Sequence, residues 1–140
     1  MIENGKLAEE LRSRLEAFAA IRFALLFGSR ASGREHPGSD LDLAVYLDEA
    51  LAPAERFELR LELTNALSDL GRPDVVILNQ APPLLGHRAL QGRLVLDRDR
   101  KAYIRYFVRT LATYHDERPW RRLHERARSR RAEEGRFGRP

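Results

Sequence analysis

Two apolar runs flank a short segment rich in glycine and serine, and this pattern limits the fold more than any other feature. Residues 22–27 (RFALLF) have the composition of a buried strand. Residues 40–47 (DLDLAVYL) place apolar side chains at alternate positions, as a strand with one face in a core does. Gly28 ends the first run, where a tight turn is expected. The chain is therefore predicted to contain a strand, a loop and a second strand.

Asp40 and Asp42 stand at the start of the second predicted strand. Because residues i and i+2 of a strand share a face, the two carboxylates project side by side. Adjacent carboxylates repel each other unless a cation lies between them, and oxygen ligands of this kind suit Mg²⁺. Gly28 and Ser29 offer backbone N–H groups that suit a phosphate. These residue types together favour phosphoryl or nucleotidyl transfer.

A third carboxylate, Asp74, opens the short β-branched run at residues 74–78 (DVVIL). Pro73 precedes this run, so it is predicted to be a third strand that begins at Asp74. If that strand lies beside the one that carries Asp40 and Asp42, three acids meet. Such a site can hold two metal ions about 4 Å apart.

The rest of the chain alternates between helical and extended patterns. Residues 7–21 predict an amphipathic helix, Pro53 and the Pro82-Pro83 pair are placed to begin two more, and residues 94–96 predict an edge strand. Two apolar stripes at helical spacing are expected to face the core. They comprise Phe57, Leu61, Leu63, Leu67 and Leu70, and then Tyr103, Phe107, Leu111 and Tyr114. The predicted fold is α/β (α+β), a small mixed β-sheet flanked by helices, with a helical C-terminal segment.

The arrangement resembles the DNA polymerase β-like nucleotidyltransferase superfamily, and more narrowly its minimal nucleotidyltransferase (MNT) domains. In that superfamily a Gly-Ser pair precedes an Asp-x-Asp motif, and a third acid lies on a neighbouring strand. Gly28, Ser29, Asp40, Asp42 and Asp74 match these positions in order. The resemblance covers residues 22–78 by motif and implies the nucleotidyltransferase fold.

The resemblance implies transfer of AMP from ATP to a hydroxyl group with release of pyrophosphate, and two Mg²⁺ ions. Its implied nucleotide-binding residues are Gly28, Ser29 and Arg30, and its implied metal-binding and catalytic residues are Asp40, Asp42 and Asp74. Many minimal members are antitoxins paired with HEPN-type ribonuclease toxins, so a hetero-oligomer with such a toxin is expected. A tyrosine of the toxin is the expected acceptor.

Charge divides the chain into two parts. Residues 1–100 hold 13 Lys and Arg against 16 Asp and Glu, whereas residues 101–140 hold 12 against 5. We expect a catalytic core over residues 1–100 and a basic helical extension over residues 101–140 that packs on it, all in one domain. The extension offers a surface for an acidic partner. A nucleic-acid partner is the less favoured interpretation, because exposed aromatic residues are not interleaved with the charges.

Several classes of protein and location are disfavoured by the composition. The chain has no cysteine, so it has no disulfides or thiolate metal sites. No apolar run approaches the ~20 residues of a membrane span, and no signal peptide is visible, so a cytoplasmic protein is expected. The lysine of a P-loop and the glycine pattern of a Rossmann fold are missing.

Two alternatives to protein adenylylation remain open from the sequence. The chain could transfer a nucleotide to a small hydroxylated compound such as an aminoglycoside. It could also act without catalysis, as an antitoxin that neutralises its toxin by binding alone. The chain is short for a nucleotidyltransferase with its own large acceptor-binding domain, which favours an acceptor brought by a protein partner.

Overall fold

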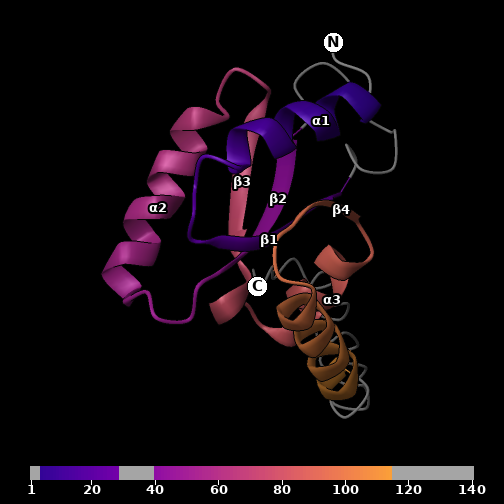
Figure 1. Cartoon of the computed structure of the whole chain (residues 1–140). Helices are drawn as coiled ribbons and strands as arrows, with labels where there is room; N and C mark the ends of the chain where they lie inside the picture. Colours follow the sequence, from indigo (N-terminus) through magenta and orange to yellow (C-terminus); the bar gives the residue numbers. More distant parts are fainter. Residues whose placement is uncertain (1–3, 29–39, 115–140) are drawn as a thin grey trace, which may run out of the picture.

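A four-stranded mixed sheet forms the centre of the structure, with helices on both of its faces (Figure 1). The computed structural model describes residues 4–28 and 40–114. The elements in chain order are α1 (Asn4–Leu15), β1 (Ile21–Phe27), β2 (Asp40–Leu47), α2 (Pro53–Ala66), β3 (Arg72–Ile77), the 3₁₀ turn η1 (Leu78–Gln80), α3 (Pro83–Leu90) and β4 (Arg93–Asp97). A further helix occupies residues 100–114. No helix among the described residues is both long and apolar enough to span a membrane.

The strand order is β3-β2-β1-β4. β1 pairs antiparallel with both β2 and β4, whereas β2 pairs parallel with β3. A parallel pair needs a crossover, and α2 supplies it. The sequence predicted the bounds of β2 and the edge position of β4 correctly. It placed the start of the third strand wrongly, because β3 begins at Arg72 and Asp74 is its third residue.

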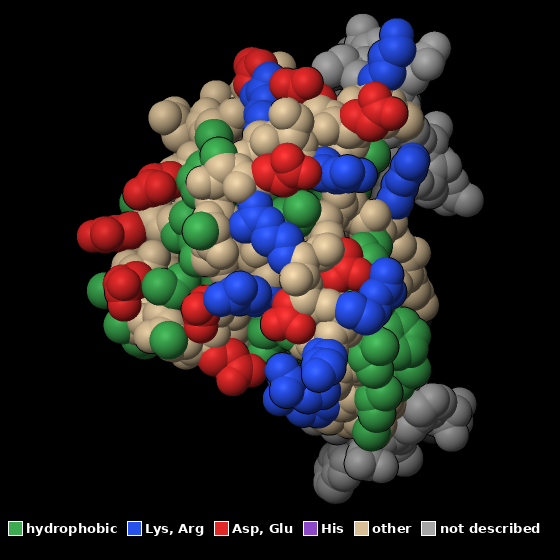
Figure 2. Space-filling model, in the orientation of Figure 1, with side chains coloured by type: hydrophobic (Ala, Val, Ile, Leu, Met, Phe, Trp, Pro, Cys, Tyr) green, Lys and Arg blue, Asp and Glu red, His purple; other side chains and the backbone are tan. Residues whose placement is uncertain are grey.

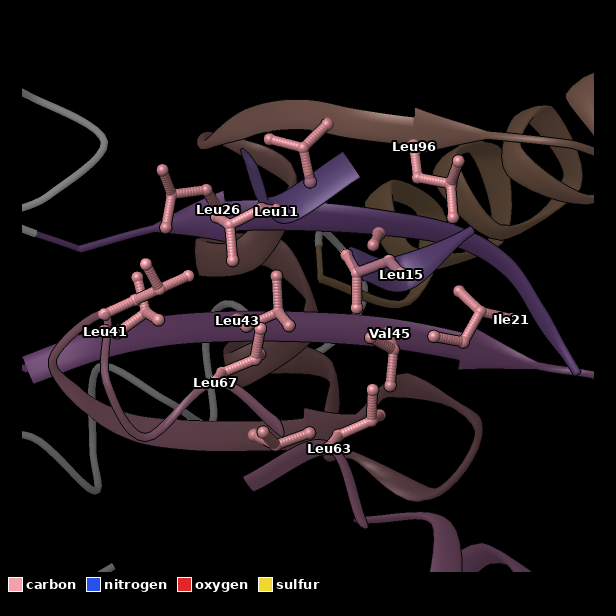
Figure 3. Close-up of a cluster of buried hydrophobic side chains, with 14 of the residues drawn as sticks. Leu11, Leu15, Ile21, Leu26, Leu41, Leu43, Val45, Leu63, Leu67 and Leu96 are labelled. Carbon is pink, nitrogen blue, oxygen red and sulfur yellow. The ribbon is translucent and has the colours of Figure 1, made fainter. Parts of the chain in front are cut away.

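One face of the sheet packs against α1 and α2. Alternate residues of β2 point to this face, where they meet leucines of both helices (Figure 3). The labelled members of this cluster are Leu11, Leu15, Ile21, Leu26, Leu41, Leu43, Val45, Leu63, Leu67 and Leu96. The alternation predicted for the strand at residues 40–47 is therefore confirmed.

The other face packs against α3 and the helix at residues 100–114, around an aromatic cluster. Phe23 of β1 stacks on Tyr46 of β2 with ring centroids 5.1 Å apart, and Tyr103 meets Phe23 edge-on at 5.2 Å. Tyr106 completes the cluster, 5.5 Å from Tyr46. Since β1 and β2 are covered on both faces, their sequences are apolar nearly throughout.

Three predictions about the helices are wrong. α1 ends at Leu15, because the chain must turn before Ile21 opens β1, so the helix predicted for residues 7–21 is too long. On α2, which does begin at Pro53, Phe57 and Leu61 are 59% and 54% exposed instead of facing the core.

The stripe predicted for the last helix is also displaced. Ala102, Tyr106 and Thr110 are the buried positions of residues 100–114, whereas Phe107 is exposed. Asp99 caps this helix, because its side chain accepts a hydrogen bond from the backbone N–H of Ala102 at 3.1 Å. The reason for the displacement is that both sides of the helix are apolar, so periodicity alone does not decide which side is covered.

Asn79 extends the pairing of β2 and β3 beyond the end of β3. Its side-chain amide donates a hydrogen bond to the carbonyl of Leu47 at 2.8 Å and accepts one from the N–H of Leu47, also at 2.8 Å. A side chain thus takes the place of the next backbone partner and fixes the path from β3 into α3.

We expect Asn79→Ala to lower the free energy of unfolding by about 1–3 kcal/mol, since both backbone groups of Leu47 lose their partner. The neighbouring Gln80→Ala, at an exposed position, is the matched control and is expected to change stability little. Denaturant unfolding of both variants measures the difference. Equal unfolding free energies would show that Asn79 does not hold this connection.

Candidate functional site

Two aspartates face each other across β2 and β3. The parallel register pairs Asp42 with Asp74, and neighbouring strands lie about 4.8 Å apart. Asp42 alternates with the leucines of β2, so its side chain is on the face of the sheet that carries the aromatic cluster. It lies near the start of β2, beyond the part of the strand that the cluster covers. The sequence prediction that Asp74 lies beside the Asp-x-Asp pair is therefore confirmed by the register.

Gly28 packs directly against the Asp42 carboxylate. Its φ is +77°, in the left-handed region that favours glycine. A Cβ built on Gly28 would collide with the Asp42 carboxylate and would lie 3.1 Å from its Cγ. The tight turn predicted at Gly28 is confirmed by its positive φ, and the close approach of Asp42 is a second reason for glycine at this position.

The electrostatics of the site centre on Asp42. Burial raises the pKa of the Asp42 carboxyl above its ordinary value, and the negative charges of Asp74 and Asp40 raise it further. The Arg88 guanidinium acts in the opposite direction. Asp42 is therefore the acid whose negative charge is least favoured at this site.

Asp40 is held slightly apart from the other two acids. Its Oδ1 lies 3.4 Å from the Nε of Arg72, which is its register partner on β3. Among residues 4–28 and 40–114, no group of three or more His, Cys, Asp or Glu side chains is placed to hold a metal ion as it stands. The ion pair is well exposed, and such a pair contributes at most about 1 kcal/mol, so Asp40 can leave Arg72 at little cost.

A cleft of about 420 Å³ adjoins the two facing aspartates. Asp42 and Asp74 line it, together with Arg60 of α2 and Arg88 of α3. The remaining wall is mostly apolar and comprises Phe27, Val75, Val76, Ile77, Gln80, Ala81, Pro82 and Leu85. Such a mixture of charge and apolar surface, at this size, suits a ligand with a phosphate and a ring.

Arg60 and Arg88 were not predicted from the sequence. Arg60 lies among several other charged residues of α2, Arg88 lies on the mostly apolar α3, and no spacing relates either one to the Asp-x-Asp motif. Only the crossover through α2 and the placing of α3 bring both to the cleft. Ser29 and Arg30, predicted to bind nucleotide, lie outside the described residues.

The family of the chain follows from this combination of fold and site. The sequence pattern of the polymerase beta nucleotidyltransferase family matches residues 9–101, which span Gly28 and all three aspartates. The chain belongs to this nucleotidyltransferase family. A comparison with curated proteins gives no significant match.

Solved structures of similar fold include several toxin–antitoxin complexes. A chain of a toxin–antitoxin crystal structure with AMP-PNP is 23% identical, with a TM-score of 0.64 over 90% of this chain and 98% of that one. A chain from a variant of the MntA complex is 25% identical, with a TM-score of 0.64 over 91% and 98%. A third, from the tri-AMPylated HEPN toxin of Shewanella oneidensis in complex with its MNT antitoxin, is 21% identical, with a TM-score of 0.58 over 89% and 95%. These likenesses confirm the predicted nucleotidyltransferase fold.

Gly28→Ala tests the contact between the turn and Asp42. We expect it to lower the free energy of unfolding by about 1–2 kcal/mol from the left-handed φ alone, and to displace the Asp42 carboxylate. The matched control is Gly5→Ala, since a Cβ on Gly5 in α1 meets nothing within 4 Å. Denaturant unfolding compares the two variants. A Gly28→Ala protein as stable as the wild type would contradict the close packing described here.

The raised pKa of Asp42 makes stability depend on pH in a defined direction. The folded chain holds the Asp42 proton more tightly than the unfolded chain does, so the free energy of unfolding falls as the pH rises from the ordinary pKa of 3.8 through the raised folded pKa. Asp42→Asn removes that loss. We expect the variant to be more stable than the wild type at pH 7, and expect the difference to vanish below the ordinary pKa of 3.8. Thermal unfolding at a series of pH values measures both.

Proposed function

We propose that this chain is an adenylyltransferase that moves AMP from ATP to a tyrosine hydroxyl of a HEPN-type toxin and so acts as its antitoxin. The observation that carries the proposal is the direct pairing of Asp42 with Asp74 in a chain of the nucleotidyltransferase family. These two carboxylates on neighbouring strands, with Gly28 packed against Asp42, would supply the acidic residues of a nucleotidyltransferase site.

The reaction needs a nucleophile, a charged leaving group and a place for one proton. The acceptor oxygen forms a bond to the α-phosphorus of ATP, the bond from that phosphorus to the bridging oxygen breaks, and pyrophosphate leaves. Asp74, which is exposed on the edge strand, would take the hydroxyl proton. Arg60 and Arg88, on the walls of the cleft, would balance phosphate charge.

The three aspartates fit Mg²⁺ by the chemistry of their oxygens and by the charge that they share. Burial and the neighbouring charges of Asp74 and Asp40 raise the pKa of Asp42, and a divalent cation would relieve the repulsion between these charges. Asp40, Asp42 and Asp74 would hold it, with Asp40 released from its exposed pair with Arg72. When bound, Mg²⁺ would neutralise the triphosphate and lower the pKa of the acceptor hydroxyl.

The solved structures of similar fold support the choice of nucleotide and acceptor. One is described as a toxin–antitoxin with AMP-PNP, and another contains a tri-AMPylated HEPN toxin with its MNT antitoxin. Both cover nearly the whole of this chain. A protein acceptor is thus the proposal that best accounts for the fold, and the small-molecule acceptor becomes an outcome of the test below.

The test is transfer of radiolabelled AMP from α-labelled ATP to the product of the neighbouring gene, tested as the HEPN-type toxin. We expect wild type with Mg²⁺ to label the toxin, and Asp74→Asn to reduce the rate roughly 100-fold or more, the typical cost of losing a general base. Removal of Mg²⁺ with a chelator is expected to stop labelling. Mass spectrometry of the labelled toxin should locate AMP on a tyrosine.

Asp69→Asn is the control, because Asp69 is an exposed aspartate that pairs with Arg14 of α1 and does not line the cleft. It should label the toxin at the rate of wild type. Toxin neutralised without any labelling would favour an antitoxin that acts by binding alone. Labelling of an aminoglycoside but not of the toxin would favour the small-molecule acceptor.

A further inference from the structure

The helix at residues 100–114 has a second apolar side that the structure leaves uncovered. Ile104, Phe107 and Val108 are 51%, 36% and 61% exposed, and their spacing of three and four residues places them on one side. We call these three residues the outer ridge. Tyr106, on the opposite side, packs in the aromatic cluster. A helix that is apolar on both sides is typical of one that is buried between two surfaces.

The charge around the outer ridge has one sign. Lys101 and Arg105 are exposed and lie three residues before Ile104 and Val108, so they form one flank of the ridge. Residues 100–114 contain no Asp or Glu. In Figure 2 hydrophobic side chains gather over the lower part of the molecule, where Figure 1 shows the orange helix, and Lys and Arg side chains lie next to them. A surface that covers the ridge should therefore be apolar with an acidic rim.

The ridge lies on the same layer as the candidate site, and α3 connects the two. Gly86 of α3 is buried against Tyr106, where a Cβ would collide with the tyrosine hydroxyl. His87 stacks on Tyr114 with ring centroids 3.8 Å apart, and the next residue, Arg88, lines the cleft beside Asp42. A protein that covers the ridge is consequently held on the side of the sheet that carries the acids.

We propose that the outer ridge is the docking site for the acidic, apolar-centred face of the protein that carries the acceptor hydroxyl. The inference rests on the proposed function, because it takes that protein to be the substrate. Charge argues against this chain's own residues 115–140, which hold nine Arg against five Asp and Glu. It argues equally against the same helix of a second copy, which would place like charges together.

The α2 face of a second copy is the competing occupant. Phe57 and Leu61 are exposed there among Glu58 and Glu62, so its charge would match the ridge. That contact would join two different surfaces in a head-to-tail manner, which leads to rings or open chains of copies. It would also place no acceptor near the cleft. If the ridge bound the α2 face of a second copy, the proposal that it docks the acceptor protein would be wrong.

The experiment compares Val108→Asp with Leu61→Asp, a matched control of similar exposure on the opposite layer. The probe is the product of the neighbouring gene, tested as the HEPN-type toxin, and its Kd is measured by calorimetry at low and high salt. We expect Val108→Asp to weaken binding at least tenfold and Leu61→Asp to leave it unchanged. Lys101→Glu combined with Arg105→Glu should weaken binding mainly at low salt. A thermal shift with Mg²⁺ and ATP in each variant confirms that the fold and site remain.

Unchanged toxin binding by Val108→Asp, or no binding by wild type, would overturn the proposal. The proposal would also be overturned if sedimentation showed that the wild type forms oligomers and that both Val108→Asp and Leu61→Asp dissociate them, since the ridge would then bind a second copy. The AMP-transfer assay separates this inference from the proposed function. Binding that depends on Val108 without any labelling would refute the catalytic role alone, whereas labelling with binding independent of Val108 would refute the docking site alone.

Discussion

The parallel pairing of β2 with β3 is the constraint on which the site depends. Its register places Asp42 directly beside Asp74, and a shift by one residue would turn one of the carboxylates to the opposite face. The crossover through α2 and the amide of Asn79, which bridges to Leu47, hold that register at either end of β3. The free energy that stabilises the acid pair is therefore supplied by leucine packing and backbone pairing, and none of it by attraction between the acids.

Burial of the sheet on both faces explains how a chain of this size can carry a repulsive site. The leucines that β2 shares with α1 and α2 fill one face, and the aromatic cluster around Phe23 fills the other. The ends of β2 and β3 with Asp42 and Asp74 project beyond the second cluster toward the cleft. Local repulsion is tolerated there because the remainder of each strand is fixed, and a repulsive site of this kind is ready for a cation.

Much of this arrangement could be predicted from the sequence, because local patterns determine it. The alternation from Leu41 onward specifies a strand, and the glycine before the loop specifies a turn. Arg88 could not be predicted, since its approach to Asp42 depends on how α3 packs on β1. The exposure of Phe57 and Phe107 was missed for a similar reason. Helical periodicity reveals an apolar side, but tertiary packing decides whether that side is covered by the chain itself.

The central claim is that Asp42 and Asp74 form one charged pair that takes a cation together with the nucleotide. The direct measurement is a carbon NMR titration of the aspartate carboxyl groups, alone and with Mg²⁺ and a non-hydrolysable ATP analogue. The account predicts that the pKa of Asp42 lies above its ordinary value of 3.8 in the free protein and falls below that value when Mg²⁺ and the nucleotide bind. A pKa of Asp42 near 3.8 that neither addition changes would contradict the account.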